Sequence, residues 1–121
     1  MAVEKRQVSI VGSSFYPGAS NWIARLKPGQ ELRVVREPDN QYDGNAIAVY
    51  IFQQKLGHLP RGFAAEVAPL IDKGFKCAAT KSKDPRFAGT GVLVLEWEKP
   101  DAAPAQEVRT EQGDEDDDPS L

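Results

Sequence analysis

The sequence has few residues from which covalent or metal chemistry could be built. It contains one cysteine, Cys77, and one histidine, His58, in 121 residues. A lone cysteine excludes an internal disulfide, and one Cys with one His forms no recognisable zinc site. No run approaches the roughly 18 consecutive apolar residues of a membrane helix, and residues 1–7 lack the regions of a secretory signal. We therefore expect a cytoplasmic protein without disulfides, bound metal or membrane segments.

Motifs of the common enzyme classes are also missing. His58 is the only candidate general base, and no G-x-S-x-G nucleophile elbow accompanies it. No lysine follows an Asp or Glu by two residues, so the carboxylate-x-lysine element of metal-dependent nucleases is absent. Neither G-x-x-x-x-G-K-[ST] nor G-x-G-x-x-G occurs, which argues against a nucleotide site. We expect no enzymatic activity and no cofactor.

The net charge of -3 conceals an uneven distribution. Residues 1–99 carry fourteen Lys or Arg against ten Asp or Glu, whereas residues 100–121 carry one against eight. The second segment has too few apolar side chains to offset the entropy of ordering it. The sequence predicts one folded, mildly basic domain at 1–99 and a disordered acidic tail at 100–121. The tail is either solvated charge or a tethered polyanion that competes with DNA, in which case its removal would tighten binding.

The apolar pattern predicts a mainly β fold. Alternating or continuous apolar residues predict six short strands, and an apolar repeat after Pro60 predicts one helix that Pro69 bends and Gly74 ends. Such a set favours a small, partly open β-barrel of five to six strands with a helix across one end. Trp22, Leu26 and Trp97 are predicted to pack inward. The predicted strands are residues 7–11, 31–36, 46–52, 55–59, 75–80 and 91–97.

Binding remains as the general function. Small β-barrels bind single-stranded nucleic acid by stacking bases on aromatic rings while Lys and Arg follow the backbone. The aromatic residues Phe15, Tyr16 and Tyr42 lie in predicted loops, and basic residues lie near strand ends. Loop aromatics can equally close the end of a barrel, so composition alone leaves both interpretations open.

Three segments together resemble the HIRAN domain. They are REPDNQYDGNAIAV at residues 36–49, LGHLPR at 56–61 and VGSSFYPG at 11–18. The resemblance covers roughly residues 7–98. It implies an OB-like β-barrel, which in the eukaryotic SWI/SNF-class remodelling ATPases captures the 3′-hydroxyl end of single-stranded DNA.

The resemblance also implies roles for individual residues. Tyr42 would stack on a terminal base, Asp43 would accept a hydrogen bond from the 3′-hydroxyl, and Asn40 would bond to the DNA. Ser14 stands where the end-binding members carry a basic residue. The remaining DNA-binding candidates are Phe15 or Tyr16 as a second stacking ring, His58 and Arg61 as contacts to base or phosphate, and Phe87 as a further aromatic.

Structural roles are the alternative for several of these residues. Asp43 and Asn45 suit a turn that bonds its own backbone amides, Tyr42 could cover the barrel end, and His58 could be an ordinary strand residue. The leading hypothesis is a module that binds single-stranded DNA, at its 3′ end, in DNA repair or replication-fork processing, with a helicase or nuclease acting in trans. The alternative is a protein-interaction adaptor that binds an extended peptide by strand addition, which Ser14 and the acidic tail favour. The sequence does not predict an oligomeric state.

Overall fold

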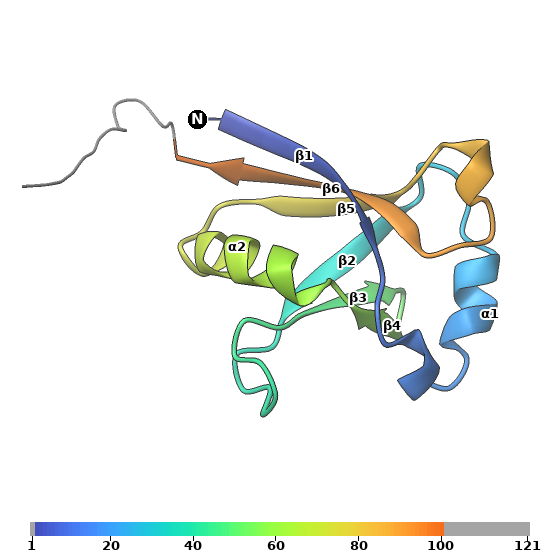
Figure 1. Cartoon of the computed structure of the whole chain (residues 1–121), viewed down its shortest axis with the longest axis horizontal. Helices are drawn as coiled ribbons and strands as arrows, with labels where there is room; N and C mark the ends of the chain where they lie inside the picture. Colours follow the sequence, from blue (N-terminus) through green and yellow to red (C-terminus); the bar gives the residue numbers. More distant parts are fainter. Residues whose placement is uncertain (1, 101–121) are drawn as a thin grey trace, which may run out of the picture.

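The computed structural model describes residues 2–100, which form a twisted antiparallel sheet with helices at its margins (Figure 1). The strands are β1 (Ala2–Ser9), β2 (Glu31–Arg36), β3 (Ile47–Ile51), β4 (Gln54–His58), β5 (Cys77–Lys81) and β6 (Val92–Lys99). The helices are α1 (Ala19–Ala24) and α2 (Arg61–Asp72), with single 3-10 turns η1 (Ser13–Phe15) and η2 (Pro85–Phe87).

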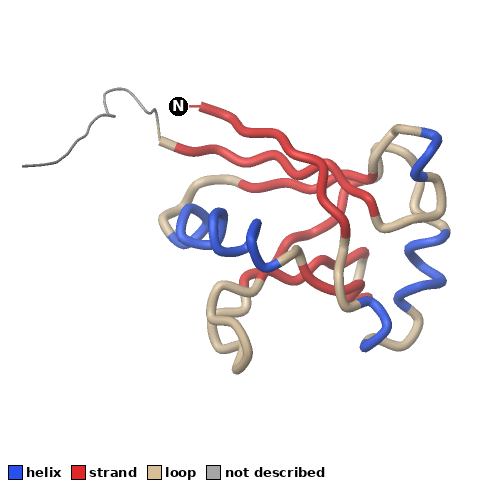
Figure 2. The backbone as a smooth tube through the Cα atoms, in the orientation of Figure 1, coloured by secondary structure: helices blue, strands red, loops and turns tan. Residues whose placement is uncertain are grey.

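The sheet curls so that its two edges meet. Its strand order is β1-β6-β5-β2-β3-β4, and every neighbouring pair is antiparallel. Just beyond β1, Val11 exchanges two backbone hydrogen bonds of 2.9 Å with His58 at the end of β4. In Figure 2 the strands wrap around a common interior. The predicted partly open β-barrel is confirmed.

The core lies between the curled sheet and α2. Strand β3 buries Ile47, Val49 and Ile51 on one face, each at most 4% exposed, and Ala48 on the other, while α2 contributes Val67. This helix lies in the space between β5 and the β3–β4 hairpin (Figure 1), and it continues through Pro69 to its end at Asp72. Trp97 is 1% exposed, as predicted from its place in the last strand.

Two expectations about the first quarter of the chain differ from the structure. Trp22 is 41% exposed, because α1 turns Ala19, Ile23 and the following Leu26 toward the core instead. The first strand begins at Ala2 and ends at Ser9, where alternation predicted residues 7–11. The early part was missed because most of its side chains face solvent, while backbone pairing with β6 runs along the whole strand.

Residues 101–121 lie outside the described range, and with them nearly all of the predicted acidic tail. No helix of the described part is long and apolar enough to cross a membrane.

Candidate functional site

A groove of about 760 Å³ opens at the end of the barrel where the two sheet edges meet. Its walls come from η1, from the loop joining β2 to β3 (residues 37–46, here called the motif loop), from the end of β4 and from the start of α2. Four segments distant in sequence therefore form one concave surface. Seven of the eight residues that the sequence analysis selected line it, namely Phe15, Tyr16, Asn40, Tyr42, Asp43, His58 and Arg61.

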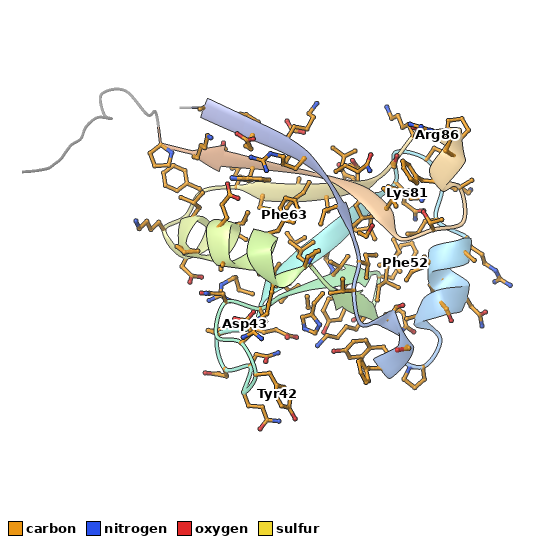
Figure 3. All side chains as sticks on the ribbon, in the orientation of Figure 1. Tyr42, Asp43, Phe52, Phe63, Lys81 and Arg86 are labelled. Carbon is orange, nitrogen blue, oxygen red and sulfur yellow. The ribbon has the colours of Figure 1, made fainter. Side chains whose placement is uncertain are left out.

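Phe87 is the selected residue that does not line the groove. It belongs to η2, which also contains Arg86. Figure 3 shows Arg86 at the opposite end of the molecule from Tyr42. The backbone carbonyl of Phe87 accepts a hydrogen bond from the buried Lys81. The structure therefore gives Phe87 a place in a separate loop.

The motif loop is held in shape by its own side chains. Asn40 Oδ1 accepts hydrogen bonds from the backbone amides of Tyr42, at 2.9 Å, and Asp43, at 3.0 Å. Asp43 Oδ1 in turn accepts from the amide of Asn45 at 2.9 Å. These are the self-bonding turns typical of Asn and Asp. They leave Asp43 Oδ2 without a hydrogen bond in the described part of the chain, and this oxygen forms an ion pair with Arg61 Nε at 3.6 Å.

Arg36, at the end of β2, fastens the motif loop to α2. Its guanidinium donates to the carbonyls of Ala46, at 2.8 Å, and Gly44, at 3.0 Å, and both oxygens of the Asp72 carboxylate accept from it. These hydrogen bonds lower the pKa of Asp72. A planar fork with several donors suits this task, which a lysine could not perform. Arg36 is thus committed to the loop.

The aromatic residues of the groove differ in how accessible they are. Phe15 and Tyr42 are each 80% exposed. Tyr16 is half-buried: its hydroxyl lies 3.5 Å from His58 Nδ1, and the ammonium of Lys55 lies 4.8 Å from its ring centre. The sequence left Phe15 and Tyr16 as alternatives for the second stacking ring, and Phe15 is the ring whose surface is free.

Beneath the groove lies an acidic residue that the sequence analysis did not select. Glu37 Oε1 contacts His58 Nε2 at 2.7 Å and Asn40 Nδ2 at 3.1 Å, while Oε2 contacts Lys55 Nζ at 2.6 Å. Burial alone would raise the pKa of Glu37, but hydrogen bonds from these three side chains lower it to about 2. Glu37 belongs to the quoted motif, yet its partners become visible only when β2, β3 and β4 are paired.

Positive charge reaches the groove from two places. One is Lys55, on β4, whose ammonium lies over the ring of Tyr16, two residues after Ser14. Burial would lower the pKa of Lys55, but its hydrogen bond to Glu37 raises it. Arg61 has a side chain that is 78% exposed, and it also donates to the carbonyl of Tyr42 at 3.1 Å. Within residues 2–100, no cluster of three or more His, Cys, Asp or Glu could hold a metal ion. The groove therefore offers ring faces, one carboxylate oxygen and an arginine.

Comparison with protein families gives one match. The model of the HIRAN domain matches residues 3–90, a range that contains every residue of the groove.

Two plant proteins are similar over about half of this chain. One, from Arabidopsis thaliana, is described as similar to a SWI/SNF-related matrix-associated actin-dependent regulator of chromatin of subfamily A; it is 42% identical over 65 residues, 53% of this chain. The other is a Fanconi-associated nuclease 1 homolog from Oryza sativa subsp. japonica, 36% identical over 70 residues, 54% of this chain. In each case the aligned part is 7% of the relative's length.

Two solved structures share the fold. The HIRAN domain of human HLTF superposes with a TM-score of 0.62 at 24% identity, covering 78% of this chain and 76% of that one. A protein from Lactobacillus plantarum superposes with a TM-score of 0.63 at 28% identity, covering 79% and 94%.

Proposed function

The chain belongs to the HIRAN domain family, and we propose that it is a DNA-binding module that captures single-stranded DNA by its 3′-hydroxyl end. The observation that carries this proposal is Oδ2 of Asp43, which faces Arg61 but accepts no hydrogen bond within residues 2–100, in a groove that also holds the exposed rings of Tyr42 and Phe15. Family membership supports DNA binding in general, and the carboxylate supports the finer assignment to an end.

Stacking supplies the affinity in this proposal. Tyr42 and Phe15 present rings that are 80% exposed, and a base stacked on an aromatic side chain contributes about 1 to 3 kcal/mol. Stacking tolerates every base, so we expect little sequence preference. Arg61 lies beside the same loop and is the available cation for the phosphate next to the terminal nucleoside.

Asp43 supplies the selectivity. An ionised carboxylate accepts hydrogen bonds and donates none, so its Oδ2 suits the proton of a sugar hydroxyl. A 3′-phosphate at the same position would bring two negative groups together, which costs binding energy. Because Oδ1 already accepts from the amide of Asn45, the carboxylate is held in one orientation before DNA arrives.

Asn40 and His58 act mainly as supports. The side chain of Asn40 already holds the amides of Tyr42 and Asp43, and it donates to Glu37. Its second amide hydrogen is what remains for DNA. His58 is held between Glu37 and Tyr16 through its two ring nitrogens, and it lines the groove.

We further propose that the domain serves DNA repair or fork processing by directing an enzyme in trans. The relatives are named as a SWI/SNF-related regulator of chromatin and a nuclease, and the matching region is a small part of each. In those chains a domain of this kind accompanies a much larger protein. Here a helicase or nuclease would be the corresponding partner.

The test is fluorescence anisotropy with 5′-labelled single-stranded DNA that ends in either a 3′-hydroxyl or a 3′-phosphate. Wild type should prefer the hydroxyl end by about tenfold, the value of one hydrogen bond to a charged group. Asp43→Asn keeps an oxygen for the Asn45 amide but removes the charge, so the preference should disappear. Asp39→Asn, an exposed charge on the same loop outside the groove, is the matched control and should keep it.

The alternative function, binding of a peptide by strand addition, predicts different results in this experiment. Equal affinity for both ends would exclude end capture, and binding to neither would favour the adaptor. Arg61→Glu should weaken DNA binding and flatten its salt dependence while leaving peptide addition unaffected. Arg36 is unsuitable for this comparison, since its reversal would release the motif loop.

A further inference from the structure

A second exposed aromatic site lies outside the groove. Trp22, on α1, and Phe52, in the β3–β4 turn, meet edge to face with ring centres 5.8 Å apart and planes at 65°. They are 41% and 65% exposed, and neither lines the groove. Figure 3 places Phe52 well away from Tyr42. This aromatic pair leaves ring surface open to solvent.

The backbone at Phe52 is unusual. Its φ of 51° makes it the one residue other than glycine with positive φ in residues 2–100. The turn is a two-residue loop between the paired Ile51 and Gln54, where Gly, Asn or Asp is strongly preferred. A bulky ring rarely adopts this conformation, and such outliers concentrate at ligand-binding positions. The carbonyl of Phe52 is also held, by Arg33 Nη2 at 2.8 Å.

Cations accompany the aromatic pair. Arg25, the exposed C-cap residue of α1, follows Trp22 by three residues in the sequence. Arg33 lies over the Tyr50 ring at 5.0 Å beside Phe52. Within the described part of the chain, neither arginine has a carboxylate within 4.0 Å. The depression next to Phe52 is lined by one basic residue, Arg33, and one acidic residue, Glu31.

Strand β4 connects the two aromatic sites. It starts at Gln54, next to Phe52, and ends at His58 in the groove. Six residues at about 3.3 Å each separate Phe52 from His58 by roughly 20 Å, a distance that a few nucleotides can span. Gln54 Nε2 also donates to the carbonyl of Pro17, which ties the hairpin to the segment between Phe15 and α1.

We propose that Trp22 and Phe52 form a second stacking surface for the same DNA strand, on the 5′ side of the captured end. Arg25 and Arg33 meet the phosphates that pass between the two sites. The inference rests on the proposed function, because the captured end fixes the direction of the strand. Exposed rings with arginines that form no ion pair within residues 2–100 suit a chain of stacked bases joined by phosphates.

The experiment compares a trinucleotide with a dodecanucleotide, both with a 3′-hydroxyl. Wild type should bind the longer strand roughly tenfold more tightly, as one additional stacked base provides. Phe52→Gly should remove this gain while leaving the affinity for the trinucleotide unchanged. Glycine suits the positive φ, so the thermal midpoint should stay the same or rise, and lost folding cannot explain the result. Trp22→Ala should act in the same direction.

Phe52→Tyr, which keeps a ring, is the matched control and should retain the gain with length. A length gain that survives in both Phe52→Gly and Trp22→Ala would overturn the proposal. No length gain in wild type would also overturn it, and a protein partner would become the expected occupant of the aromatic pair. A failure of end capture itself would show in a separate measurement: the trinucleotide would then bind with the same affinity whether it ends in a 3′-hydroxyl or a 3′-phosphate.

Discussion

Two charged side chains, one partly buried and one fully buried, are compensated in different ways. Glu37, under the groove, faces the ammonium of Lys55 and the ring of His58. Lys81, on β5, is 1% exposed and donates to the backbone carbonyls of Phe87 and Thr90, at 2.6 Å each. Within residues 2–100 no carboxylate lies within 4.0 Å of Lys81. The charge of Glu37 is paired with a cation, whereas the charge of Lys81 is compensated only by hydrogen bonds to backbone carbonyls in the described part of the chain.

The pKa values show what this difference means. Hydrogen bonds outweigh burial at Glu37 and lower its pKa to about 2, so the fold favours its charged form. At Lys81 burial lowers the pKa, so the fold disfavours its charged form. The groove is therefore built on a charge that folding stabilises. The η2 loop is held by the ammonium of Lys81, whose charged form folding disfavours. Removing the charge of Glu37 and removing that of Lys81 should therefore change the stability of the fold differently.

The largest effect is expected for Glu37→Gln. The change removes the charge and one of the two acceptor oxygens, so the side chain can no longer accept from both Lys55 and His58 in the present arrangement. A pKa lowered from 4.5 to about 2 corresponds to about 3 kcal/mol of unfolding free energy. Because the folded pKa lies below the unfolded one, this stability is present above pH 4.5 and is lost as the pH falls toward 2. Denaturant unfolding of both proteins across this range measures it.

The two proteins should differ by about 3 kcal/mol at neutral pH and converge in strong acid. A constant difference at every pH would contradict the assignment of the effect to the Glu37 charge. Asp39→Asn, on the exposed side of the same loop, serves as the control, and its unfolding curves should follow those of wild type.

A smaller loss is expected for Lys81→Met. Methionine fills a similar volume but leaves the carbonyls of Phe87 and Thr90 without their donor, while relieving the burial of a charge. These opposing terms leave a destabilisation of about 2 kcal/mol. Chemical denaturation at neutral pH measures it. Lys81→Arg tests whether the charge or the shape matters, since a guanidinium keeps donors but does not fit the same space.

For Lys81→Met the difference in stability from wild type should depend on pH in the alkaline range, whereas for Glu37→Gln it depends on pH in the acidic range. The folded pKa of Lys81 is lowered below 10.5, so its stability term is complete above that pH and is lost as the pH falls through the folded value. The advantage of wild type over Lys81→Met should therefore widen as the pH rises toward 10.5. A gap that narrows instead would show that the charged form is the favoured one.

Local features of the fold and of the groove could be predicted from the sequence. Alternating apolar residues identify the strands because one face of each is buried, and the motif residues fall in one groove because local turns set their positions. The Asp43 side chain accepts from the amide of Asn45, as its spacing in the turn predicted, while the second side chain that accepts from turn amides is that of Asn40. Their groove neighbours Phe15 and Arg61 come from other segments, and only the family resemblance brought them together before the fold was known.

The remaining features depend on contacts between distant segments. Lys55 and Glu37 are separated by 18 residues, and their pairing requires the register of three strands. Lys81 looks like an ordinary polar residue at a strand end, and its burial follows from how η2 folds over it. Trp22 was predicted inside because large apolar residues usually are, yet Ala19 and Ile23 on α1, with Leu26 after it, are the residues buried there. Periodicity reveals a buried face but not which large residue stays outside it.

The smallest effect is expected for Arg86→Ala, which removes an exposed charge from the loop that contacts the buried Lys81. Arg86 forms a close ion pair with Asp84, at 2.7 Å, within the same η2 loop that Lys81 holds from inside. Its side chain is 81% exposed, so water screens the pair and the ordering of a long side chain opposes it. The thermal midpoint should be unchanged within error, and any shift at low salt should vanish at high salt. A loss comparable to that of Lys81→Met would mean that the η2 loop depends on its surface charges as much as on the buried ammonium.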